Sequence, residues 1–150
     1  MSMQQFLDTV RSFDSVLELA PTEGSGFPEI AWGDHFFYYA PDGKVPNGQP
    51  YATFVTKDYP GDTGSGLDAP GRWRINVHVG KKAFAELVTD PEQGGGHDFG
   101  AADVLLPHPL YADQGWIAVV DPGPGTTPML LELVRRAHDA ARERARRRTG

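Results

Sequence analysis

The chain has 150 residues, a usual length for one domain and long enough to bury a core without disulfides or a metal. Hydrophobic residues make up 39% and charged residues 23%, which is typical of a globular rather than a disordered protein. No cysteine is present, which excludes disulfide bonds, thiolate metal ligands and a cysteine nucleophile. The net charge of −6 combines a +4 segment, residues 129–150, with a −10 remainder that repels phosphate backbones.

The first element expected is a helix from Met3 to about residues 12–14. Ser2 and Gln5 have the spacing of a capping box, and apolar residues then recur at helical intervals. Short strands are expected at 15–20 and 27–32. The run at 35–39 is aromatic on both faces, which favours a central strand covered on both sides.

A strand at 51–57 and a glycine-rich loop at 58–70 come next. Residues 73–79 then alternate strictly, with apolar side chains on one face and Arg74, Asn76 and His78 on the other. This strand leads into a short helix at 81–88.

The last third of the chain continues with a loop at 89–102 and an extended segment at 103–109, where His108 lies between two prolines. A buried apolar strand is expected at 116–120. Thr127 is the expected N-cap of a final helix, whose basic end at about 143–150 is expected to fray.

This order predicts a single α+β domain with an ordered core at about 3–142. A mostly antiparallel sheet of about five or six strands should pack on one face against the N-terminal, middle and C-terminal helices. The first residues lack the features of a signal peptide, and no apolar run reaches the ~18 residues that span a bilayer. We therefore expect a cytoplasmic protein without membrane contact, and the composition is typical of a bacterial gene.

Four segments carry a resemblance that extends over about residues 3–142: 32–39, 51–60, 74–80 and 103–111. On them the chain resembles the bacterial family known as domain of unknown function 6194. More distantly its layout is similar to the MmcQ/YjbR-like fold, which implies the fold just described. That likeness also implies nucleic-acid binding as one alternative, which the acidic remainder disfavours. Neither resemblance implies catalytic residues.

Seven residues are candidates for a ligand site near one sheet face. Arg74, Asn76 and His78 can bind a small anion or polar ligand if their face lines a groove; otherwise they lie in solvent or beneath a loop. His108, followed by Tyr111, is held by its prolines and suits acid/base or metal chemistry, or else anchors the segment by hydrogen-bonding backbone carbonyls. The others are Lys57 and Tyr59, at the start of a loop that lacks phosphate-binding glycine spacing.

Some aromatic side chains should lie on the side of the sheet that the helices do not cover. There they can form an apolar pocket, a dimer interface or part of the hydrophobic core. The leading hypothesis is a non-catalytic module that binds a small molecule or a protein, with no cofactor and no metal. A homodimer through the sheet is one arrangement. One rival is a small enzyme that uses His78 or His108, with Asp34 or Asp58 completing a metal site. The other is a nucleic-acid-binding module that uses the basic tail.

Overall fold

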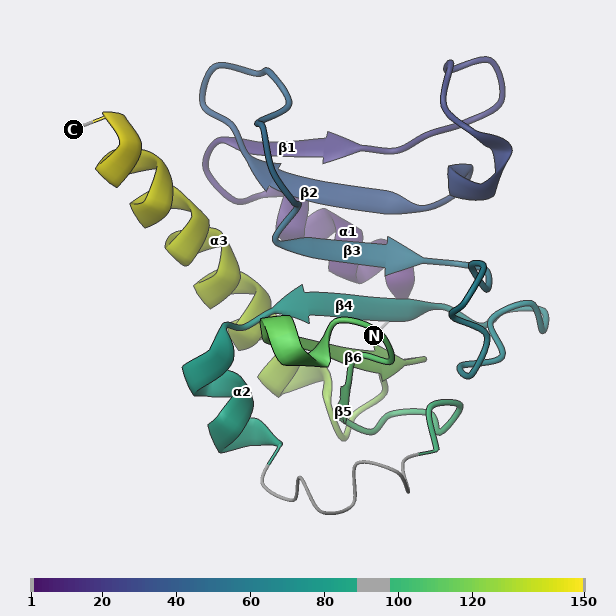
Figure 1. Ribbon diagram of the computed structural model, residues 1–150. Coiled ribbons are helices and arrows are strands. Elements are labelled where there is room, and N and C mark those ends of the chain that lie inside the picture. Colours follow the sequence, from purple (N-terminus) through teal and green to yellow (C-terminus); the bar gives the residue numbers. More distant parts are fainter. Residues whose placement is uncertain (1, 89–97, 150) are drawn as a thin grey trace.

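The computed structural model describes residues 2–88 and 98–149 (Figure 1). The helices are α1 (Met3–Arg11), α2 (Lys81–Leu87) and α3 (Thr127–Thr149), with 3-10 helices η1 (Glu29–Ala31) and η3 (Ala112–Gln114). The strands are β1 (Val16–Leu19), β2 (His35–Tyr39), β3 (Ala52–Val55), β4 (Arg74–His78), β5 (Leu106–Pro107) and β6 (Trp116–Val120). The predicted single α+β domain is therefore confirmed. The predicted fraying of 143–150 is not tested, and the loop expected at 89–102 lies largely outside the described residues.

The six strands form one open antiparallel sheet in the order β1-β2-β3-β4-β6-β5. Residues opposite one another in the register share a face, so Phe37, Ala52 and Val77 lie in one row across β2, β3 and β4. The rows between them, such as Phe36, Thr53 and Asn76, point to the other face.

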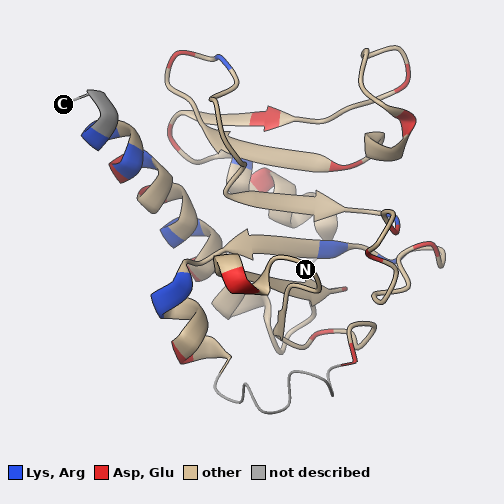
Figure 2. Cartoon of the chain, in the orientation of Figure 1, with Lys and Arg blue, Asp and Glu red and all other residues tan. Residues whose placement is uncertain are grey.

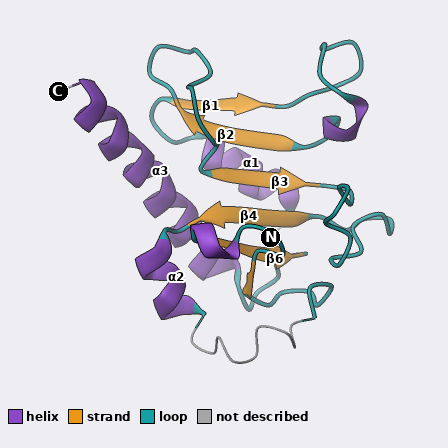
Figure 3. Ribbon diagram, viewed as in Figure 1, coloured by secondary structure: helices purple, strands orange, loops and turns teal. Residues whose placement is uncertain are grey.

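The core lies between the helices and the sheet face that carries Phe37, Ala52 and Val77. Figure 1 shows α1 behind the sheet and η3, the short green helix, in front of it; Figure 3 gives the same view coloured by secondary structure. Buried apolar side chains interlock there, and each buried Val, Leu, Ile or Phe contributes about 1.5–3 kcal/mol of transfer free energy. From the sheet they are Phe37, Phe54, Ile75, Val77, Ile117 and Val119, and from α1 and α3 they are Phe6, Leu7, Val10, Leu130, Leu133, Val134 and Ala137.

Local signals explain where α1 begins. The Ser2 hydroxyl accepts a hydrogen bond from the Gln5 backbone N–H at 3.3 Å, and the Ser2 N–H donates to Gln5 Oε1 at 2.8 Å. Both halves of the predicted capping box are present, so that prediction is confirmed.

The start of α3 differs from the prediction. Thr127 is already inside the helix, and its hydroxyl donates to the Gly123 carbonyl instead of capping. The distant Asp103 carboxylate accepts from the backbone N–H groups of Gly123, Gly125 and Thr126 at 2.8–2.9 Å. It also accepts from the Thr126 hydroxyl, which is the largest cause of its lowered pKa. A carboxylate far away in sequence holds this helix end, which local spacing cannot reveal.

Two strand predictions also need correction. Residues 27–32 form no strand, because η1 turns the chain there and the Trp32 N–H closes onto the Glu29 carbonyl at 3.0 Å. Strand β2 has partners on both edges, as expected of an inner strand, but helices cover only one of its faces. Phe36 and Tyr38 stay partly exposed on the other face, and this leaves room for a pocket.

Gly115, which links η3 to β6, gives a testable packing constraint. Its φ is +87°, and a Cβ there would lie 2.6 Å from the Gly80 carbonyl carbon. We expect Gly115→Ala to lower the free energy of unfolding by more than about 2 kcal/mol, measured in urea. Gly43→Ala is the control, because its φ is +73° with no atom within 4 Å of the added Cβ. It should lose only about 1 kcal/mol of backbone strain, so equal losses would contradict the packing argument.

Candidate functional site

A pocket of about 350 Å³ opens on the sheet face that the helices leave uncovered. Four aromatic side chains line it: Phe36, Tyr38, Tyr111 and Trp116. The first two project from β2, the indole from β6, and Tyr111 from the turn before η3. The polar lining comes from Gln49, Thr53, Asn76 and His108. An apolar wall with few polar groups is the usual construction of a small-molecule site.

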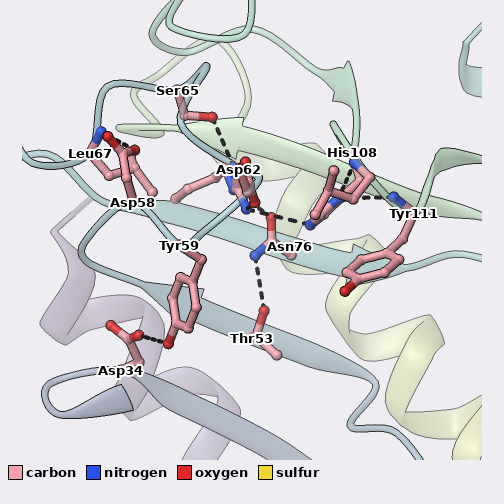
Figure 4. Close-up of polar contacts among 12 residues, drawn as sticks. Asp34, Thr53, Asp58, Tyr59, Asp62, Ser65, Leu67, Asn76, His108 and Tyr111 are labelled. Atoms are coloured by element: carbon pink, nitrogen blue, oxygen red, sulfur yellow. Dashed lines mark hydrogen bonds and ion pairs between the residues drawn. The ribbon is translucent and has the colours of Figure 1, made fainter. Parts of the chain in front are cut away.

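Asn76 forms the centre of the polar floor and is 3% exposed. Its amide Nδ2 donates to the Thr53 hydroxyl at 2.9 Å, across the β3–β4 pair. Its Oδ1 accepts from the Arg74 Nε at 2.8 Å. The amide is therefore fixed in orientation from both sides: its Nδ2 bonds Thr53 (Figure 4), and its oxygen bonds the Arg74 guanidinium.

Arg74 lies beneath the floor in a buried ion pair. Its Nη1 and Nη2 donate to the two Asp62 carboxylate oxygens at 3.0 and 2.6 Å, and Nη1 also donates to the Ser65 hydroxyl at 2.9 Å. Arg74 is 2% and Asp62 6% exposed. The glycine-rich loop at 58–70 thus covers Arg74. Of the alternatives that the sequence left open, Arg74 lies beneath a loop and does not line an open groove.

His108 is held where β5 ends. Its backbone N–H donates to the Trp116 carbonyl at 3.1 Å, and its Nδ1 accepts from the backbone N–H groups of Leu110 and Tyr111 at 3.0 and 3.2 Å. Burial, reinforced by the Arg74 cation and opposed by Asp62, lowers the pKa of His108 to about 4. The ring is neutral near pH 7, and its Nδ1 anchors the turn that carries Tyr111.

His78 does not share this pocket. It lines two separate hollows that also contain Arg144 of α3, and its Nε2 lies 3.1 Å from the Gln114 carbonyl. Burial, followed by the Arg144 cation, lowers its pKa, and the Gln114 hydrogen bond opposes this. The Trp116 ring is near both imidazoles, with centroid distances of 5.5 Å to His78 and 6.4 Å to His108. The two histidines therefore flank one indole instead of facing a common cleft.

Lys57 and Tyr59 belong to another cluster, around the fully buried Asp34. Asp34 accepts from the Thr56 backbone N–H at 2.8 Å, the Thr56 hydroxyl at 2.7 Å and the Lys57 ammonium at 3.1 Å. The Tyr59 hydroxyl donates to its other oxygen, and burial followed by this bond raises the pKa of Tyr59. These polar atoms are satisfied within the cluster, so the geometry gives them a structural role outside the pocket.

Residues 2–88 and 98–149 contain no group of three or more histidine and acidic side chains that could hold a metal ion. The two carboxylates expected to complete a metal site with the histidines have other partners: Asp34 accepts from the Tyr59 hydroxyl, and Asp58 accepts from the Leu67 N–H at 2.9 Å.

The basic residues of α3 alternate with acidic ones, as Figure 2 shows. Arg136 pairs with Glu132 at 2.5 Å and Arg142 with Asp139 at 3.4 Å. Arg136 lines a hollow together with Gly80 and Ala83 at the start of α2, where Lys81 and Lys82 are exposed. No helix among the described residues is long and apolar enough to cross a bilayer.

Reasoning from sequence missed several groups that build this pocket. Thr53 could have been found, because it lies opposite Asn76 once the β3–β4 register is known. Asp62 and Ser65 carry no such signal, since loop residues reach Arg74 only through the tertiary fold. The buried His138 was also missed: its Nε2 donates to the Asp14 carbonyl at 2.8 Å, and its Nδ1 accepts from the Tyr51 hydroxyl at 2.9 Å.

Comparison with known proteins places the chain in a family without assigning it a function. Neither the curated proteins nor the solved structures contain a match, so the likeness to the MmcQ/YjbR-like fold stays a prediction. The model of one family, described as "Family of unknown function (DUF6194)", matches residues 1–150. That match covers the whole chain and agrees with the resemblance carried by segments 32–39, 51–60, 74–80 and 103–111. The chain therefore belongs to the DUF6194 family.

Proposed function

We propose that this domain binds a small, partly apolar molecule in the pocket on the sheet face opposite α1 and α3, without catalysing a reaction. The observation that carries this proposal is the convergence of Phe36, Tyr38, Tyr111 and Trp116 around a floor whose polar groups are fixed by buried contacts. Such a site provides apolar area for affinity and a few oriented polar atoms for specificity. A larger hollow of about 680 Å³ beside residues 67–73 has one aromatic side chain, Trp73, and fits this role less well.

The chemistry of the lining supports binding over catalysis. No lining side chain is a carboxylate, a lysine or an arginine. The imidazole of His108 already uses Nδ1 as an acceptor, so its other nitrogen carries the proton and cannot act as a base at neutral pH. An acid/base enzyme needs a titrating group near the operating pH, and a pKa of about 4 does not supply one at pH 7.

A protein partner is the second candidate, because apolar side chains are exposed at the rim. Leu110 and Tyr111 are 47% and 44% exposed. A homodimer or another protein that covers this face would bury them and close the pocket. Analytical ultracentrifugation of the wild type and Leu110→Asp tests this: a dimer that the variant abolishes favours the protein interface over a small ligand.

Binding is tested by NMR and thermal shift with a library of small metabolites. We expect ligands to shift the amide signals of Thr53, Asn76 and Trp116 and to raise the melting temperature. Tyr111→Ala removes one wall and should weaken binding about tenfold, the value of an aromatic contact. Phe27→Ala is the matched control, because Phe27 is also 44% exposed and does not line the pocket. If no compound shifts the pocket signals, or if both variants bind equally, the proposal fails.

A further inference from the structure

The hydrogen bonds of His108 determine where its proton lies. Two backbone N–H groups, of Leu110 and Tyr111, donate to Nδ1. A nitrogen that accepts carries no hydrogen, and a neutral imidazole has one proton, so that proton must lie on Nε2. The ring is 5% exposed and lines the pocket. His108 is therefore a buried N–H donor through Nε2.

The polar group that lies within hydrogen-bond distance of Nε2 cannot accept this proton. Arg74 Nη2 lies 3.4 Å away, and a guanidinium has five donors and no acceptor. Four of those donors have partners: Nε bonds Asn76, Nη1 bonds Asp62 and Ser65, and one N–H of Nη2 bonds Asp62. The fifth is directed toward His108 Nε2, so two N–H groups face each other where an acceptor is needed.

The rest of the pocket floor has the same donor character. Asn76 Oδ1 already accepts from Arg74, and one N–H of its Nδ2 goes to Thr53, which leaves a second N–H. No carboxylate lines the pocket, so the strongest acceptors in proteins are missing from its lining. A buried donor without an acceptor is unfavourable, and a ligand that supplies one relieves this.

We infer that the ligand of this pocket carries a carboxylate, which accepts from His108 Nε2 and the free N–H of Asn76 while an apolar or aromatic body lies among the four aromatic side chains. The inference rests on the proposed binding function and deepens it by naming the ligand class. The Arg74–Asp62 pair is neutral as a unit and holds these donors in place. A carboxylate gains more from such donors than a neutral oxygen does, because charge-assisted hydrogen bonds are stronger.

The tautomer is tested first, on the free protein. Long-range ¹H–¹⁵N NMR of the imidazole nitrogens distinguishes a protonated Nε2 from a protonated Nδ1. At pH 7 we expect the His108 proton on Nε2. A proton on Nδ1 would make Nε2 an acceptor for Arg74 and would overturn the inference.

The ligand class is tested with matched probes, phenylacetate against 2-phenylethylamine, followed by aryl and alkyl carboxylates against the corresponding amines. We expect the carboxylates to shift the pocket signals and to bind at least tenfold more tightly than the amines. Equal binding, or a preference for amines, overturns the carboxylate inference and leaves the pocket itself as a binding site. If neither series shifts Thr53, Asn76 or Trp116, the proposed function fails, and this inference fails with it.

Two variants of His108 separate a ligand contact from a structural role. In His108→Asn the side-chain oxygen can replace Nδ1 as the acceptor for Leu110 and Tyr111, while the donor at Nε2 is lost. In His108→Gln an amide N–H can reach the place of Nε2, while the Nδ1 acceptor is lost. We expect the Asn variant to lose carboxylate binding by tenfold or more and the Gln variant to keep part of it. The opposite order would mean that His108 acts only by holding the turn, and would overturn the inference.

Discussion

Asp62→Asn is expected to lower the free energy of unfolding by about 3–5 kcal/mol, because it leaves the buried Arg74 cation without its counter-ion. The remaining side-chain acceptors for Arg74 are the neutral Asn76 and Ser65, and its other polar neighbour, His108, offers only an N–H group. An amide at position 62 supplies one acceptor instead of two, and its NH₂ group faces a donor. Urea unfolding at pH 7, with the far-ultraviolet CD signal as the readout, measures the change.

Two comparisons make this prediction specific. Glu132→Gln breaks the exposed pair with Arg136, whose side chains are 62% and 69% exposed, and should cost less than about 1 kcal/mol. The double variant Asp62→Leu with Arg74→Met removes both buried charges and should recover much of the loss. If Asp62→Asn is no worse than Glu132→Gln, the buried pair does not stabilise the fold as the geometry indicates.

The same ion pair links the stability of the fold to the order of the pocket. Arg74 orients Asn76 through Nε, and its Nη2 lies against His108. Asp62 comes from a turn closed by its own N–H to the Tyr59 carbonyl at 2.8 Å, and Tyr59 in turn bonds Asp34. The Lys57–Tyr59 segment therefore bears on the pocket indirectly, by positioning the loop that provides Asp62.

The sequence predicts those parts of the site that depend on strand periodicity. The alternation of residues 73–79 places Ile75 and Val77 in the core and Arg74, Asn76 and His78 on the other face, as the structure has them. Periodicity predicts which face of the sheet a side chain lies on, but it does not predict which pocket on that face the side chain lines. His78 thus shares a face with Asn76 and still lies beside α3, outside the pocket.

Contacts between loops and strands are the parts that the sequence does not predict. The prolines around His108 predict an extended backbone there, but the backbone N–H groups that hold its side chain come from the following turn. The sequence suggests that Lys57 and Tyr59 are accessible in a polar loop. In the structure both donate hydrogen bonds to the buried Asp34. Such pairings span 23 and 25 residues, and only the packed sheet brings them together.

The acid sensitivity of the fold gives the second large prediction, and it depends on the neutral state of His108. The folded protein keeps this ring unprotonated down to a pKa of about 4, whereas an exposed histidine takes up a proton near 6.5. Between these values the unfolded chain binds more protons than the folded one, so stability is full above about pH 6.5 and falls as the pH decreases. Burial also lowers the pKa values of His78 and His138, which adds to the loss in the same direction.

His108→Asn isolates the part that His108 contributes. At about 1.4 kcal/mol for each pH unit, wild-type stability should lose about 2.5 kcal/mol through His108 between pH 7.5 and 4.5, and the variant should lack that loss. Arg74 and Asp62, the charged groups that face the ring, are present in both proteins and cancel in the comparison. The stability gap between wild type and variant should therefore narrow as the solution is acidified, measured by urea unfolding at several pH values. Parallel curves would mean that His108 titrates alike in the folded and unfolded chains, and that its ring is not the buried neutral donor that the pocket geometry requires.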